Sequence, residues 1–166
     1  MLTVGWKSNS LGRVNEVIEI VLADKRRLEE LYQCLFDEDA WVRMRAADAI
    51  EKVCRVHPDW LEAYIDRFSQ ELAASTQPSI QWHLAQIYAE VDLTRGQKRF
   101  AIDWLKERLT SPQCDWIVAS NSMDTLAQFV RDGSVPVAEF RSLLEVQKEH
   151  TSKAVVKRAN KLSEAL

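Results

Sequence analysis

The stretch DAWVRMRAADAI at residues 39–50 carries the pattern on which the fold depends. Apolar or small side chains recur within it and just after it, at Val42, Ala46, Ala49, Ile50 and Val53. The last four follow the first at +4, +7, +8 and +11. At about 3.6 residues per turn, these spacings bring all five side chains to one side of a helix. The stretch therefore predicts an amphipathic helix with one buried stripe.

The same stripe returns every 37 or 38 residues along the chain. Its later copies are Ile80, Leu84, Ile87, Tyr88 and Val91, then Val118, Ser122, Thr125, Leu126 and Phe129, and finally Val155, Ala159, Leu162, Ser163 and Leu166. A second apolar set precedes each stripe, as Leu28, Leu31 and Leu35, then Ile65, Phe68 and Leu72, then Ile102, Leu105 and Leu109. Two helical stripes per copy predict stacked helix pairs that share one interior.

Turn-forming residues separate the predicted helices. Pro58, Gly96 and Gly133 stand between successive pairs, where they end one helix or precede the next. In the fourth copy Phe140, Leu143 and Leu144 replace the periodic apolar positions, and a one-residue slip explains the difference. We therefore predict a single domain over residues 1–166, with an N-terminal cap at 1–23 and helix pairs at 24–57, 58–95, 96–132 and 134–166.

The quoted stretch resembles the HEAT-repeat pattern, in which an Asp in the turn precedes Val-Arg, small residues and an aliphatic residue. Here Asp39, Val42 and Arg43 occupy these places, and the similarity extends over residues 24–166. The resemblance implies an all-α fold, a right-handed α-α superhelix of about four helix pairs with an N-terminal capping helix. It also implies that the second helices line the concave side, and that the chain is similar to scaffolds, adaptors and transport factors. Arg43 is expected to pair with Asp39.

The motif is complete in one copy only, because later copies depart from it. The positions equivalent to Arg43 hold Gln81 and Ala119, and those equivalent to Asp39 hold Gln77 and Asp115. The regular ladder of Asp and Arg side chains is therefore not expected along the whole stack.

Composition and charge exclude several classes of protein. The chain has 46% hydrophobic and 28% charged residues with only four Gly and four Pro, which favours an ordered helical domain. Its formal charge of −3 and isoelectric point of about 5.7 give no general attraction for nucleic acid or anionic membranes. No signal peptide or membrane-spanning segment is apparent, and Cys34, Cys54 and Cys114 show no zinc-binding spacing. We expect a cytoplasmic protein without a metal or cofactor.

The face opposite the second-helix stripes is the candidate partner-binding surface. Its predicted residues are Trp41, Met44, Asp48, Trp82, Gln86, Ser120 and Asp124, and the same face is expected to hold Ser79, Glu51 and Ala127. The apolar strip of Trp41, Met44 and Trp82, rimmed by charge, is typical of a surface that anchors a partner segment. The competing interpretation is that these tryptophans fill joints between helices. Trp60, Trp104 and Trp116 are expected to be structural.

Four basic residues cluster near the C-terminus, at Lys153, Lys157, Arg158 and Lys161. They indicate either a site for an acidic partner or phosphate, or the solvated face of a terminal helix. The second interpretation is the simpler one.

Catalytic arrangements are sparse in this sequence. His57, His83 and His150 form no zinc-type pair, and there is no glycine-rich phosphate loop. The leading hypothesis is a non-enzymatic scaffold or adaptor that binds a protein or peptide. The main alternative is DNA binding or repair, as in the alkylpurine DNA glycosylases built from HEAT-like repeats, with Trp82 and either Asp48 or Asp124 in the active cleft. The acidic isoelectric point disfavours that alternative.

A third possibility is that the chain stabilises a partner within an oligomer. The sequence does not separate this role from the first hypothesis, and it does not set the oligomeric state.

Overall fold

A computed structural model describes residues 12–166, and every regular element within this range is helical. The α-helices are α1 (Val14–Ala23), α2 (Leu28–Gln33), α3 (Ala40–Val56), α4 (Pro58–Leu61), α5 (Ile65–Arg67), α6 (Pro78–Glu90), α7 (Arg95–Arg108), α8 (Trp116–Arg131), α9 (Val137–Lys148) and α10 (Lys153–Glu164). Short 3-10 turns are η1 (Lys25–Arg27), η2 (Cys34–Phe36) and η3 (Glu62–Tyr64), and η4 (Phe68–Leu72) is a π-helical turn.

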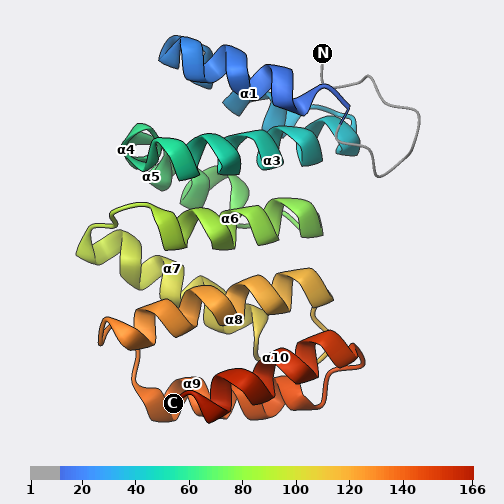
Figure 1. The fold of residues 1–166 in the computed structure, drawn as a ribbon, viewed down its shortest axis with the longest axis vertical. Coiled ribbons are helices and arrows are strands. Elements are labelled where there is room, and N and C mark those ends of the chain that lie inside the picture. The colour runs from blue at the N-terminus through green and yellow to red at the C-terminus, as the bar shows by residue number, and fades with distance from the viewer. Residues whose placement is uncertain (1–11) are drawn as a thin grey trace.

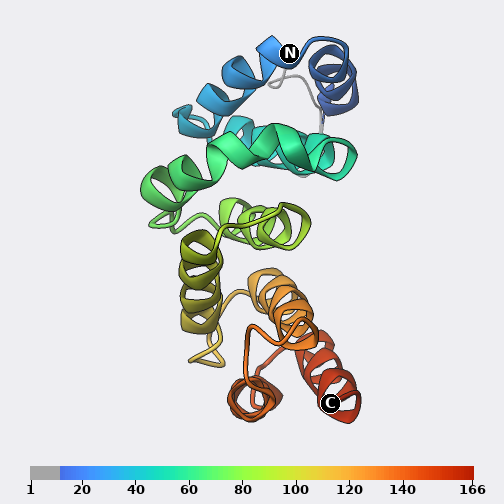
Figure 2. The ribbon, with the colours of Figure 1, turned by 90° about the vertical axis from the view of Figure 1, so that its left-hand side faces the viewer.

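The helices form two stacked rows. Figure 1 shows α1, α3, α6, α8 and α10 lying side by side from one end of the molecule to the other. Behind them lie α2, the short α4 and α5, α7 and α9 (Figure 2). The stack bends, and the first row lies on the inner side of the bend. We call the first row the inner row and the second the outer row. The chain is thus an all-α solenoid of helix pairs, and the hand of its superhelix stays a prediction.

The predicted repeat positions form the core. All nine residues of the first-helix set are buried, from 0% exposure at Ile65 to 8% at Ile102. The stripes of α3, α6 and α8 are buried throughout, which includes the polar residues Ser122 and Thr125. The predicted slip in α9 is confirmed, since Phe140 and Leu144 are fully buried.

The last copy of the stripe departs from the prediction. Val155 and Ala159 are fully buried, but Leu162 is only partly buried and Leu166 is 39% exposed. Leu166 lies beyond the end of α10, where no further helix covers it in the described part of the chain. The prediction that it belongs to the core is wrong.

Local sequence signals set the ends of the helices. The Asp39 side chain accepts a hydrogen bond from Trp41 N–H at the start of α3, and Thr94 and Gln97 form a capping box at the start of α7. After α8, Gly133 takes a φ of 80°, a left-handed conformation that suits glycine, and its N–H bonds to Val130 O. These residues fix where α3 and α7 begin and where α8 ends.

At the N-terminal end, α1 joins the inner row and packs on α3. It buries Val14 and Val21. Residues 1–11 of the predicted cap, and the expectation that this segment is not a signal peptide, lie outside the described residues. Among the helices of residues 12–166, none has both the length and the apolar character to cross a bilayer.

Candidate functional site

On each central helix of the inner row, α3, α6 and α8, a strip of side chains is left partly exposed. Met44 and Asp48 on α3 are followed 38 residues later by Trp82 and Gln86 on α6, and after 38 more by Ser120 and Asp124 on α8. All six side chains are partly exposed, and Trp41 at the start of α3 is 40% exposed. We call these seven residues the inner-row surface. The structure places none of them in the core.

The two carboxylates of this surface are held in ion pairs. Lys52 Nζ lies 2.7 Å from Asp48 Oδ2 on the same helix. Asp124 on α8 pairs with Arg158 on α10, so this contact joins two inner-row helices. Ser120 Oγ donates to Trp116 O at 2.8 Å. The charged groups are therefore mixed in sign and locally neutralised.

A buried histidine lies beneath this surface. His83 is 6% exposed, its ring lies 5.2 Å from that of Trp82, and its Nδ1 is 3.1 Å from Gln86 Oε1. Burial lowers the pKa of His83 to about 4, although the nearby Asp48 carboxylate opposes the shift. The imidazole is therefore neutral at physiological pH. It supports Trp82 and Gln86 and adds no charge to the surface.

Some residues expected on the open face are covered instead. Ser79 and Ala127 are each 5% exposed, and Glu51 is 3% exposed with its carboxylate paired to Arg55. Burial raises the pKa of Glu51. These three expectations are wrong because a helix within the row has neighbours on both sides. The exposed strip on each helix is therefore narrower than the exposed face expected from a helical wheel.

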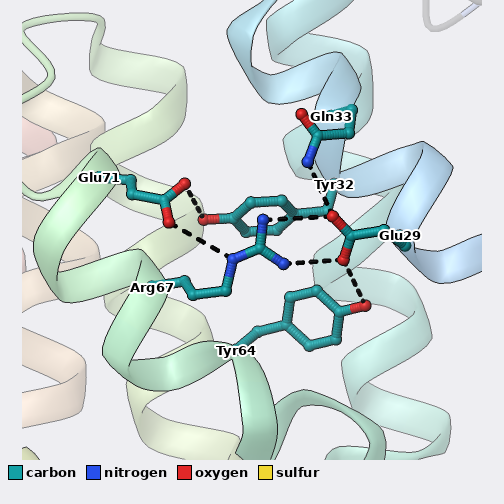
Figure 3. Close-up of polar contacts among 6 residues, drawn as sticks. All are labelled: Glu29, Tyr32, Gln33, Tyr64, Arg67 and Glu71. Atoms are coloured by element: carbon teal, nitrogen blue, oxygen red, sulfur yellow. Dashed lines mark hydrogen bonds and ion pairs between the residues drawn. The ribbon is translucent and has the colours of Figure 1, made fainter.

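A second polar cluster lies in the outer row and was not predicted from the sequence. Figure 3 shows how Arg67, at the end of α5, lies among residues of α2, η3 and η4. Its guanidinium carbon is 3.9 Å from the centre of the Tyr32 ring, and its Nη1 is 2.7 Å from Glu29 Oε2. Tyr64 donates to Glu29 and Tyr32 donates to Glu71, each at 3.1 Å. We call this group the Arg67 cluster.

The Arg67 cluster fastens the first two helix pairs together. Hydrogen bonds from Arg67, and then from Gln33, lower the pKa of Glu29 to about 2. Burial raises the pKa of Tyr32 well above its ordinary value. The carboxylates of Glu29 and Glu71 already accept hydrogen bonds from within the cluster. We therefore interpret the cluster as a structural contact between neighbouring elements of the outer row. Two pairs of polar residues in this cluster are spaced i,i+4 in the sequence, Glu29 with Gln33 and Arg67 with Glu71. Neither spacing indicates that the two pairs lie in contact in the fold.

Comparison with known proteins now identifies the architecture. A model of the HEAT repeat domain matches residues 7–164. The chain belongs to the HEAT-repeat family. No curated protein and no solved structure matches it.

The HEAT-repeat turn is built differently from the expected Arg43 and Asp39 pair. Arg43 Nε donates to Gln77 Oε1 at 2.7 Å, and its Nη1 donates to the main-chain oxygens of Asp37 and Glu38. Asp39 is occupied as the N-cap of α3. The expectation is wrong because Gln77, in the next repeat, supplies the acceptor. The amide also donates to Ala40 O at 2.9 Å, which joins the two turns.

The remaining tryptophans of this HEAT-repeat chain divide between core and surface. Trp104 is buried and donates to Ala73 O at 2.9 Å, and Trp60 is half-buried against His57. Trp116 is 51% exposed, so the expectation that it is structural is wrong. It is the first residue of α8, directly after the N-cap Asp115, where the turn holds the side chain away from the core.

Proposed function

We propose that the chain is a non-enzymatic scaffold or adaptor that holds a segment of a partner protein along the inner-row surface. The observation that carries the proposal is the repetition of one open strip per helix, with Trp41, Met44 and Trp82 partly exposed on it. Stacked repeats create extended concave surfaces of this kind, and such surfaces bind proteins in many solenoid families.

The chemistry of the strip also supports a protein partner. Large aromatic and methionine side chains supply apolar contact area and are enriched at the centres of protein interfaces. The surrounding residues are polar or charged, namely Gln86, Ser120 and the ion-paired Asp48. They suit the hydrated, polar rim of a protein interface. A duplex-binding groove instead needs several bases directed at phosphates. The mixed charges here favour the scaffold over the DNA-repair alternative.

We further propose that the protein works in the cytoplasm. The three cysteines, Cys34, Cys54 and Cys114, are free thiols. Free thiols that form no disulfide fit a reducing compartment.

The test is partner capture from lysate of the native host, with the purified protein as bait. Replacing Met44 and Trp82 together by alanine should reduce recovery of the main partner by about tenfold, because central aromatic anchors carry about 2 kcal/mol or more. The matched control is Phe100→Ala, which removes a 38% exposed aromatic side chain from α7 in the outer row. Circular dichroism checks that both variants stay helical. Undiminished capture by the double variant would contradict the proposal.

A further inference from the structure

The strip of the inner-row surface continues onto α10 with a different chemistry. Thirty-seven residues after Ser120 and Asp124 stand Lys157 and Lys161, and α10 is the next helix of the inner row. The positions that hold Met44 and Asp48 on α3 and Trp82 and Gln86 on α6 are therefore lysines on α10. Along the stack, the open strip therefore changes from apolar and polar side chains on α3 and α6 to basic side chains on α10.

These lysines line an open hollow on the surface of α10. Its volume is about 570 Å³, and its walls come from the turn before α10 and from the helix itself, at His150, Thr151, Lys153, Val156, Lys157, Asn160, Lys161 and Glu164. We call it the α10 hollow. Three of its side chains are cationic and one is anionic, so its charge is positive.

The lysines of the α10 hollow differ from Lys52 and Arg158, which belong to the same row, in having no ion-pair partner among residues 12–166. Lys52 is paired with Asp48, and Arg158 is paired with Asp124. Within residues 12–166, Lys153, Lys157 and Lys161 form no ion pair or hydrogen bond. Their ammonium groups are therefore free to meet an anionic ligand.

The turn that forms the rim of the hollow is fixed by His150. Its Nε2 lies 2.7 Å from Cys114 O, and its Nδ1 accepts from Ser152 N–H at 2.8 Å. The ring is buried at 8% exposure, and both nitrogens are engaged. His150 therefore positions the start of α10 and leaves recognition to the lysines.

We propose that the α10 hollow binds an acidic stretch of the partner segment, with several Asp or Glu residues close together in its sequence. The inference rests on the proposed function and adds the chemistry of the partner. The partner would carry apolar side chains where it meets α3 and α6, and carboxylates where it meets α10.

The spacing of the lysines suits an extended peptide. From Lys153 to Lys161 the helix rises about 12 Å, at about 1.5 Å per residue. An extended peptide covers that length with about four residues, at about 3.3 Å each. A DNA duplex is a poorer fit, because it offers phosphates over a wider surface, whereas the hollow has three lysines on a single helix.

A capped peptide of about ten glutamates tests the inference without knowledge of the partner. Fluorescence anisotropy would measure its binding to the full chain in about 50 mM and about 300 mM NaCl. We expect K153Q/K157Q/K161Q to weaken binding by about tenfold, and the higher salt to weaken binding to the unmodified chain severalfold. The charge-matched control, R95Q/R99Q/R141Q, removes three exposed arginines from α7 and α9 in the outer row. It should change affinity by less than about twofold.

Three results would overturn the inference. The peptide does not bind the unmodified chain, the two triple variants weaken it equally, or a short DNA duplex binds through the same lysines at least as tightly as the peptide does. Failure of the inference is separable from failure of the proposed function. If Met44 and Trp82 are needed to capture the partner but the three lysines are not, the scaffold role stands and the acidic specificity does not. If the lysines bind the peptide but no partner depends on Met44 and Trp82, the scaffold role fails.

Discussion

Ala46 illustrates how single residues set the closeness of the helices. It lies in the middle of α3 and has no exposed surface, and Ala49 one turn later is equally buried. Small side chains at these points let neighbouring helices approach, because an interior packed at crystal-like density has no room for more atoms.

Replacement of Ala46 by Phe should lower the free energy of unfolding by about 1 to 3 kcal/mol through overpacking. The control is Ala138→Phe, at an exposed position of α9, which has the same loss of helix propensity without the steric conflict. Urea denaturation followed by circular dichroism measures both. Equal midpoints for the two variants would show that the inward face of α3 is wrongly assigned.

At the same scale, Glu29 makes stability depend on pH. Its pKa is about 2 in the folded chain, against an ordinary value of 4.5, because Arg67 and Gln33 bond to its charged form. A lowered pKa stabilises the fold fully above pH 4.5, and this contribution is lost as the pH falls from 4.5 toward 2.

Glu29→Gln should therefore flatten the fall in the free energy of unfolding over this acidic range. Glu62→Gln, at an exposed position of η3 that pairs with no charged residue of the described range 12–166, should leave the slope close to that of the unmodified chain. Urea titrations at a series of pH values give the slopes. If both variants kept the original slope, Arg67 and Gln33 would not stabilise the charged form of Glu29.

Among the elements, α9 is joined to the preceding pair by one buried amide. Gln147 is fully buried, and its Nε2 donates to Leu109 O and Ser111 O, both at 3.0 Å, in the turn after α7. These carbonyls lie past the end of a helix, where main-chain acceptors need partners from elsewhere.

Gln147→Ala should cost about 1 to 3 kcal/mol, since it leaves two carbonyls without this donor. Hydrogen exchange should quicken most in α9 and α10. Gln113→Ala, which removes an exposed amide from the same turn, serves as the control. Exchange rates in α9 that match the control would mean that Gln147 does not fasten the last pair.

The elements also show where sequence reasoning succeeded. Burial of Leu31, Phe68 and Leu105 was predicted because a stack of equivalent pairs repeats its apolar residues at a fixed interval. The Arg67 cluster was not predicted, because its side chains come from separate turns and follow no period. Trp116 was misplaced because a helical wheel says little about the first residue after an N-cap.

For the molecule as a whole, the two rows of helices lie on opposite sides of a bend (Figure 2). Specific contacts such as the Arg67 cluster join elements of the outer row (Figure 3). The inner row also has such contacts, for example between Arg158 and Asp124, but it leaves a strip of side chains partly exposed. The sequence predicted this strip from the wheel, and Met44, Trp82 and Ser120 are partly exposed on it. The helical wheel predicted too wide a strip, because it omits the neighbouring helices of the row. Glu51, for example, was expected on the open face but is buried.

The most direct test of the account is photo-crosslinking in the native host, with p-benzoylphenylalanine placed at Gln86 on α6 or at Arg99 on α7. Gln86 is partly exposed on the inner row, and Arg99 is exposed on the outer row. If the inner-row surface holds the partner, a defined crosslinked protein forms from Gln86 and disappears in the Met44→Ala, Trp82→Ala background, while Arg99 gives no such product. Crosslinking of the same protein from Arg99 but not from Gln86 would contradict the account.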